Sequence, residues 1–315
     1  MRMKTAHRTL CIFMHYSNSL FIPQYVLIYL SELSNYFNEV ILVTNERVID
    51  NDYLVHNQNI SLVMVKNEGY DFGMFYKVFK SIDPSEYLQI ACINDSNVLF
   101  NNLNPIFEWG KSQNLDFWGL IDSYQKPWFS THHDNYHIQS HFLVFNRKAI
   151  AELPAFFKSI HIESFFEEKD QIKLRRTIIN EWEIGLTQFL ISRLLTCGSY
   201  INSSSFSHLY LSGKITNVGH RLYAELIHSG YPLVKKKVIT KSIWKDIFHQ
   251  NKPWEKLIRQ NGNQDWKIEE LIQELIQISN ESENQSIIKL KKTFWNTFNL
   301  LSTKAIKKYK VSEKL

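Results

Sequence analysis

The sequence predicts an α/β protein with a mostly parallel sheet flanked by helices and a helical segment towards its C-terminal end. Strand-length apolar stretches alternate with stretches of helical period over residues 9–95, and the chain after residue 240 is charged with a helical pattern. The 315 residues are 44% hydrophobic, which suffices for one large core with an appendage.

Four apolar stretches in the first half predict buried strands, at residues 9–17, 39–45, 60–67 and 86–95. The fourth, "EYLQIACIND", is apolar on both faces, as in a parallel sheet that helices cover on both sides. Helices are predicted between them at 22–37, where apolar residues follow a helical period, and after "YDFG", where Phe72, Phe75 and Phe79 recur. Alternating strands and helices predict parallel strands with right-handed crossovers.

The pattern loosens after residue 100. The sequence predicts a short helix at 104–113, strands at 116–123 and 137–146 with a polar, aromatic loop between them, a helix at 183–200, and further helices from about residue 240.

Composition argues against several classes of protein. The formal net charge is +5, much of it in the last thirty residues, so we expect no nucleic-acid partner. The three cysteines, at 11, 92 and 197, lack zinc-like spacing and fit a reducing cytoplasmic compartment. The apolar run after the basic N-terminus is short and contains His15, which argues against a signal peptide, and no stretch reaches the roughly 20 apolar residues that span a bilayer.

A first polar cluster follows the third predicted strand and contains Asn67, Gly69, Asp71 and Gly73. Ligands of open α/β sheets bind beyond the carboxyl ends of the strands, and glycines let the backbone approach a ligand. Helix N–H groups starting near Asp71 would suit a phosphate or a hydroxyl. The alternative is a plain glycine turn with Asp71 as a helix cap. Asp71-Phe72-Gly73 matches a protein-kinase motif, but the other kinase motifs are missing.

A second polar cluster, Asn94-Asp95-Ser96, follows the fourth strand. Asp95 offers a carboxylate to a divalent cation such as Mg²⁺ or Mn²⁺, which would in turn bind a diphosphate. The alternative is again a helix cap.

Four stretches together resemble bacterial nucleotide-sugar glycosyltransferases of GT-A type, especially the rhamnan-synthesis F family. They are "NEGYDFGMFYKVF", "CINDSNVLF", "DFWGLIDS" followed by "HIQSHFLVFN", and "EIGLTQFLISRLLTCGSY". The resemblance implies a GT-A-like, Rossmann-type catalytic domain over residues 1–238, with a helical segment at 239–315. Asn94-Asp95-Ser96 stands where such enzymes carry a two-acid metal motif, but it has one acid.

The resemblance implies a hexosyltransferase that moves a sugar, with dTDP-rhamnose the first donor to test, onto a growing surface polysaccharide, with inversion. A base would take the acceptor hydroxyl proton. Glu183 stands where inverting members place that base, although Ile184 replaces the Asp that usually follows it. A position at a helix start would keep Glu183 ionised, and Asp122, Asp134 and Glu181 are its rivals.

The loop "KPWFSTHHDNYH" lies where GT-A acceptor loops lie. Trp128 and Phe129 would stack on a sugar, with His132 and His133 as further acceptor contacts. A plain surface loop is the alternative, and the histidine spacing fits no standard zinc site.

Residues 286–310 form a basic amphipathic pattern that predicts a helix on an anionic membrane surface, or one packed on the main domain. A cytoplasmic enzyme, peripheral on the inner face of the cell membrane, would meet a glycan or lipid-linked glycan acceptor there. Two rival functions remain: a non-catalytic nucleotide- or glycan-binding subunit of an assembly complex, and a membrane-bound scaffold.

Overall fold

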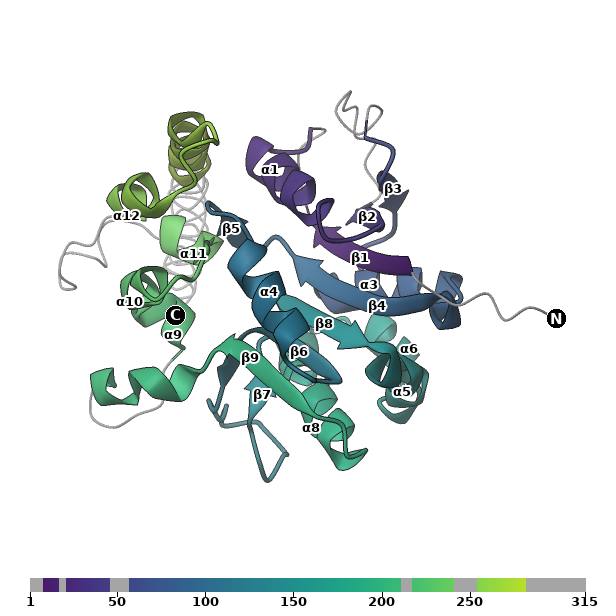
Figure 1. The fold of residues 1–315 in the computed structure, drawn as a ribbon. Helices are drawn as coiled ribbons and strands as arrows, with labels where there is room; N and C mark the ends of the chain where they lie inside the picture. The colour runs from purple at the N-terminus through teal and green to yellow at the C-terminus, as the bar shows by residue number, and fades with distance from the viewer. Residues whose placement is uncertain (1–7, 17–20, 46–56, 211–216, 241–253, 282–315) are drawn as a thin grey trace, which may run out of the picture.

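A computed structural model describes residues 8–16, 21–45, 57–210, 217–240 and 254–281. In this part of the chain, eight strands form one mixed sheet in the order β3-β2-β1-β4-β8-β6-β7, with β9 beside β6 (Figure 1). In that order the strands are β3 (Ile60–Met64), β2 (Glu39–Thr44), β1 (Arg8–His15), β4 (Tyr87–Asn94), β8 (Phe142–Asn146), β6 (Phe117–Ser123), β7 (His137–Ile138) and β9 (Cys197–Ile201).

The first four strands are parallel neighbours, and β9 runs parallel to β6. β8 is antiparallel to both β4 and β6. The expected α/β class with a mostly parallel sheet and helices around it is therefore confirmed, with an antiparallel insertion at its centre. A small second sheet pairs β5 (Asn97–Leu99) with β10 (Leu233–Lys235).

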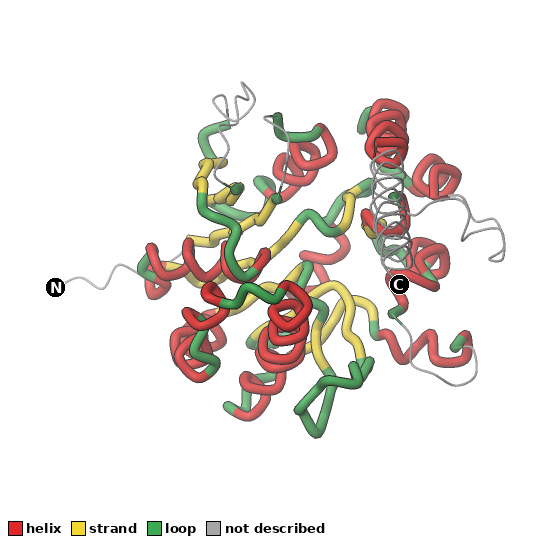
Figure 2. The backbone as a smooth tube through the Cα atoms, turned by 180° about the vertical axis from the view of Figure 1, so that it is seen from behind, coloured by secondary structure: helices red, strands yellow, loops and turns green. Residues whose placement is uncertain are grey.

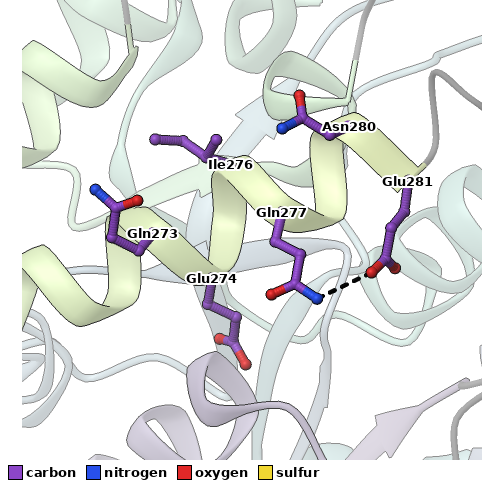
Figure 3. A pocket seen from close by; sticks show the side chains of 6 residues that line it. All are labelled: Gln273, Glu274, Ile276, Gln277, Asn280 and Glu281. Atoms are coloured by element: carbon purple, nitrogen blue, oxygen red, sulfur yellow. Dashed lines mark hydrogen bonds between the residues drawn. The ribbon is translucent and has the colours of Figure 1, made fainter.

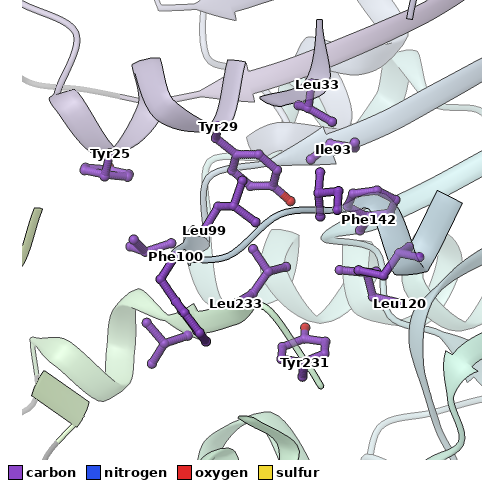
Figure 4. Close-up of a cluster of buried hydrophobic side chains, with 14 of the residues drawn as sticks. Tyr25, Tyr29, Leu33, Ile93, Leu99, Phe100, Leu120, Phe142, Tyr231 and Leu233 are labelled. Carbon is purple, nitrogen blue, oxygen red and sulfur yellow. The ribbon is translucent and has the colours of Figure 1, made fainter. Parts of the chain in front are cut away.

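Helices cover both faces of the sheet, as Figures 1 and 2 show from opposite sides. Side chains of β1 alternate between two buried clusters: Cys11 and Phe13 enter one, and Ile12 and Met14 the other. The first cluster, part of which Figure 4 shows, is covered by α1 (Gln24–Leu33), α4 (Asn104–Ser112), α9 (Val218–Arg221), α10 (Tyr223–His228) and α12 (Trp254–Asn261). The second is covered by α3 (Tyr70–Ser81), α5 (Arg147–Ser159), α6 (Glu163–Glu167), α7 (Gln171–Thr177) and α8 (Gly185–Ser192).

Two predicted elements in the second half are wrong in extent. The strand expected at 137–146 is broken after Ile138 and resumes at Phe142. The helix expected at 183–200 ends at Ser192, because Leu194 takes a left-handed backbone (φ 62°) and is 91% exposed. The chain then enters β9, an outer strand that supplies a parallel partner to β6.

The C-terminal helices share a core with the sheet. Residues 268–281 are helical, and Leu271, Ile272 and Leu275 are fully buried in the same cluster as Cys11 and Phe13 of β1. The predicted domain boundary between residues 238 and 239 stays a prediction. The predicted amphipathic helix at 286–310 lies outside the described residues. Within the described ranges, no helix is both long and apolar enough to cross a membrane.

Candidate functional site

Asp95 is the centre of a polar cluster beyond the carboxyl ends of β1 and β4. Its Oδ2 lies 2.6 Å from His15 Nδ1 and accepts hydrogen bonds from Tyr25 Oη (3.0 Å) and Lys236 Nζ (2.8 Å). The three partners come from β1, from the start of α1 and from α11 (Lys236–Ile239). The Asp95 side chain is only 9% exposed. A buried carboxylate of this kind requires the donors that surround it.

Backbone pairing fixes this arrangement. Met14 is in register with Asn94, and the Asp95 N–H donates to the Met14 carbonyl, so Asp95 lies beside His15. The Asn94 side chain accepts from the backbone N–H of Ser96 and holds the turn that follows. The Ser96 carbonyl accepts from the backbone N–H of Lys236, which brings the distant lysine to the same corner.

Lys236 and His15 decide the ionisation of Asp95. Burial alone would raise the pKa of Asp95, but the Lys236 charge and the His15 hydrogen bond outweigh it and hold the pKa well below its ordinary value. The ionised form of Asp95 is therefore favoured in the site.

Asp71 is the second carboxylate near this cluster. It lies in the first turn of α3, a helix that begins after Gly69 in a left-handed conformation (φ 77°) and packs against β1 and β2. Burial, followed by the negative charge of Asp95, raises the pKa of Asp71 to about 7, while Lys236 opposes this rise. Asp71 is therefore close enough to Asp95, Lys236 and Glu183 to feel their charges.

Gly73 keeps the Asp71 segment in place. Its N–H donates to the Gly69 carbonyl, and a Cβ atom at Gly73 would lie 1.7 Å from the Glu68 carbonyl oxygen, so no other residue fits. Asn67 is exposed in the same segment. β3 and β4 are not adjacent in the sheet, since β2 and β1 lie between them. The packing of α3 over β1 carries Asp71 back to the Asp95 side.

Glu183 lies near this cluster from the opposite half of the chain. Its Oε1 accepts a hydrogen bond from Ser140 Oγ (2.9 Å) in the break between β7 and β8. Its charge raises the pKa of Asp71 and acts on Lys235, whose pKa burial lowers to about 8. The Lys235 ammonium donates to Gln139 Oε1 and Asn217 Oδ1.

The expected position of Glu183 at the start of a helix is wrong. α7, the π-helical segment Ile178–Ile184 and α8 form a continuous helical run, and Glu183 lies in its middle. The dipole of a helix N-terminus therefore does not act on Glu183. The wider π-helical turn is instead a local feature that often marks functional sites.

The loop at residues 124–136 projects beyond β6 and β7 (Figure 2) and packs on the helical run that carries Glu183. His132 Nε2 lies 2.9 Å from the Asn180 carbonyl oxygen, and the Thr131 N–H donates to the Asn180 side chain. Trp128 is 80% exposed, with Phe129 against its edge and the Arg176 guanidinium 4.7 Å from its ring centre. His133 is exposed.

Two of the three rivals of Glu183 for the base, Asp122 and Asp134, have local partners. Asp122 is buried at the end of β6, where its Oδ1 accepts from the backbone N–H of Ser203 at 2.6 Å. Asp134 is exposed and accepts from the backbone N–H of Tyr136 in its own loop. Both contacts are those of turn- and helix-capping residues.

A divalent cation on Asp95 Oδ2 would compete with the donors that this oxygen already has. Mg²⁺ would have to lie about 2.1 Å from a carboxylate oxygen, yet Asp95 Oδ2 already has three donors, one of them the Lys236 ammonium. Among the residues that the structure describes, no group of three or more His, Cys, Asp or Glu side chains is placed to hold a metal ion.

The sequence did not predict that His15, Tyr25 and Lys236 would contact Asp95. His15 had a signal, a polar residue ending an apolar strand, and Lys236 belongs to the charged run "VKKK". Tyr25 had none, because its hydroxyl reaches Asp95 from an ordinary amphipathic helix.

A surface depression lies elsewhere, on the helix at 268–281 (Figure 3). None of its lining residues belongs to the cluster. Its Glu274 points to α1, where the carboxylate accepts from the backbone N–H groups of Gln24 (2.7 Å) and Tyr25 (2.9 Å). Pro23 gives α1 no side-chain cap, so Glu274 caps the helix that carries Tyr25.

Comparisons with known proteins identify a family for most of the chain. The family model described as rhamnan synthesis protein F matches residues 40–311. The virulence protein VirA of Vibrio anguillarum is 23% identical over 203 residues, which cover 55% of this chain. The chain spans 60% of the length of the curated relatives it matches.

Similarity to solved structures is weaker. A putative glucose-1-phosphate thymidylyltransferase from Bacillus anthracis is 9% identical with a TM-score of 0.39, over 61% of this chain and 86% of that one. A 4-diphosphocytidyl-2C-methyl-D-erythritol synthase from Anaerococcus prevotii is 14% identical with a TM-score of 0.40, over 67% and 92%. At these scores neither structure carries an argument about function.

Proposed function

Because the chain belongs to the rhamnan synthesis protein F family, we propose that it is a glycosyltransferase of GT-A type. It would move a sugar from a nucleoside-diphosphate donor to a growing bacterial surface polysaccharide. Residues 40–311 match the family, so the resemblance to the rhamnan-synthesis F family is confirmed. The family name makes dTDP-rhamnose the first donor to test.

The observation that carries this proposal is the set of charged side chains around Asp95. Asp71, Asp95 and Glu183 come from three separate parts of the chain, and Lys236 lies among them. The cluster is at the carboxyl ends of β1 and β4, where open α/β sheets bind their ligands. A carboxylate with a pKa near 7 is a common mark of a functional site.

In the proposed reaction, a carboxylate takes the proton of an acceptor hydroxyl as its oxygen forms a bond to the anomeric carbon. The bond between that carbon and the diphosphate breaks, and the nucleoside diphosphate leaves with the electron pair. Glu183 is the proposed base, with Ser140 holding its side chain. The segments at 67–73 and 94–96 would hold the donor.

The loop at 124–136 is the proposed acceptor contact. It packs through Thr131 and His132 on Asn180, one turn before Glu183, so an acceptor held by this loop would approach the base. Arg176 already lies against the Trp128 ring and would help to orient it. Inversion at the anomeric carbon and a peripheral membrane location through residues 286–310 stay predictions.

The test is a thermal-shift screen of the wild-type chain against nucleotide sugars, each with and without Mn²⁺. A ligand that binds the folded state raises the melting temperature according to its affinity. At least one donor should do so for the wild type and not for Asp95→Ala. A folded Asp95→Ala variant with unchanged donor response would remove Asp95 from the site.

A further inference from the structure

The Lys236 ammonium lies where a divalent cation was expected. Its Nζ is 2.8 Å from Asp95 Oδ2 and 2.9 Å from Tyr25 Oη. An ammonium has three N–H donors. Two are used by these contacts, and the Lys236 side chain is 30% exposed, so the remaining donor is available to a ligand.

The charges around this corner need such a group. Asp95 is ionised, and the charge of Glu183 also acts on this corner. A diphosphate brought next to them would be repelled unless a cation lay between. The cation must also stabilise the charge that grows on the diphosphate as the bond to the sugar breaks.

We propose that Lys236, held in position by Asp95 and Tyr25, is the cation that binds the donor diphosphate, so that donor binding needs no divalent metal ion. The inference rests on the proposed function and names the residue that serves its leaving group. Asp95 then acts as a positioning residue, which holds the lysine in place through a charged hydrogen bond.

The two neighbouring lysines do not share this position. Lys235 instead donates to Gln139 and Asn217. Lys237 is exposed one residue further along α11. Lys237→Met therefore removes the same charge from the same short helix and is the matched control.

The test is calorimetric titration of the full chain with UDP, dTDP and GDP, once in EDTA and once in excess MnCl₂. We expect at least one nucleoside diphosphate to bind the wild type with affinities that agree within about twofold in the two buffers. Lys236→Met should weaken that binding by about tenfold or more, as for a lost hydrogen bond to a charged group. Lys236→Arg should restore much of it, and Lys237→Met should match the wild type.

Lys236→Met leaves Asp95 buried without its cation, which can prevent folding. The second comparison therefore uses Asp95→Asn as the reference and adds Lys236→Met to it, so that no unpaired charge is buried. Affinity should fall again when the lysine is removed from this neutral background. No further loss would overturn the inference.

Two other results separate this inference from the proposed function. Binding that EDTA abolishes and Lys236→Met leaves intact would overturn the lysine role and leave the glycosyltransferase standing. No binding of any nucleoside diphosphate by the folded wild type in either buffer would overturn the proposed function, and this inference with it.

Discussion

In the folded protein, the carboxyl group of Asp71 favours its protonated form. Its pKa is about 7 in the folded protein against an ordinary value of 3.8, because burial and the charge of Asp95 oppose ionisation. The stabilisation from a raised pKa is complete below the ordinary value and is lost as pH rises towards 7. The wild type should therefore lose stability as the pH rises from 3.8 to about 7, because the buried Asp71 carboxyl group must ionise. Asp71→Asn removes this ionisable group.

Melting temperatures of Asp71→Asn and wild type should differ more at pH 8 than at pH 5, with the variant higher at pH 8. Asp83→Asn is the control, because a hydrogen bond from Ser85 lowers the pKa of that exposed carboxyl, so its effect should stay constant over the same range. An equal difference for Asp71→Asn at both pH values would show that Asp71 is not held in its protonated form.

Glu183 and Glu181 lie two residues apart on the same π-helical segment, which makes them a natural pair for testing the base. Glu183→Gln should slow transfer by about 10²-fold or more, the usual loss of a general base. Nucleotide affinity should barely change, since the missing interaction matters in the transition state. Glu181→Gln, which keeps an acceptor oxygen for Asn180 but removes the charge, should transfer at near the wild-type rate. If Glu183→Gln transfers sugar as fast as Glu181→Gln and the wild type, Glu183 is not the base.

At the scale of elements, the helix at 268–281 supports the site through α1. Glu274 caps α1 at Gln24 and Tyr25, and Tyr25 in turn donates to Asp95. Glu274→Ala should lower the free energy of unfolding by about 1 kcal/mol, the cost of a lost helix cap. Glu270→Ala, which removes only an exposed pair with Lys267, should cost a few tenths of a kcal/mol. Chemical denaturation measures both, and equal losses would contradict the capping role.

The elements also show what a single sequence can predict. The apolar pattern located β1, β2, β3, β4 and α3 to within a few residues, because β1, β2 and β4 are largely buried on both faces and α3 buries one face. It missed the end of α8 and the start of β9, where the apolar pattern continues but Leu194 turns the chain. The pairing of Lys236 with Asp95 joins residues 141 apart. Such a contact depends on the pairing of β5 with β10, and local patterns carry no information about it.

At the scale of the molecule, the sheet gathers residues from both ends of the chain into one corner. The C-terminal helices bury Leu271 and Ile272 in the core that also holds β1, so the site and its supports belong to one packed unit. The central claim is that this corner is the donor site of a glycosyltransferase.

The most direct test is transfer of a labelled sugar from a panel of nucleotide donors, including dTDP-rhamnose, to a polysaccharide or lipid-linked glycan acceptor. The wild type should form labelled product from at least one donor, and Asp95→Ala should form none while remaining folded. Donor binding without any transfer would contradict the claim, and would make the protein a nucleotide-binding subunit of the assembly machinery.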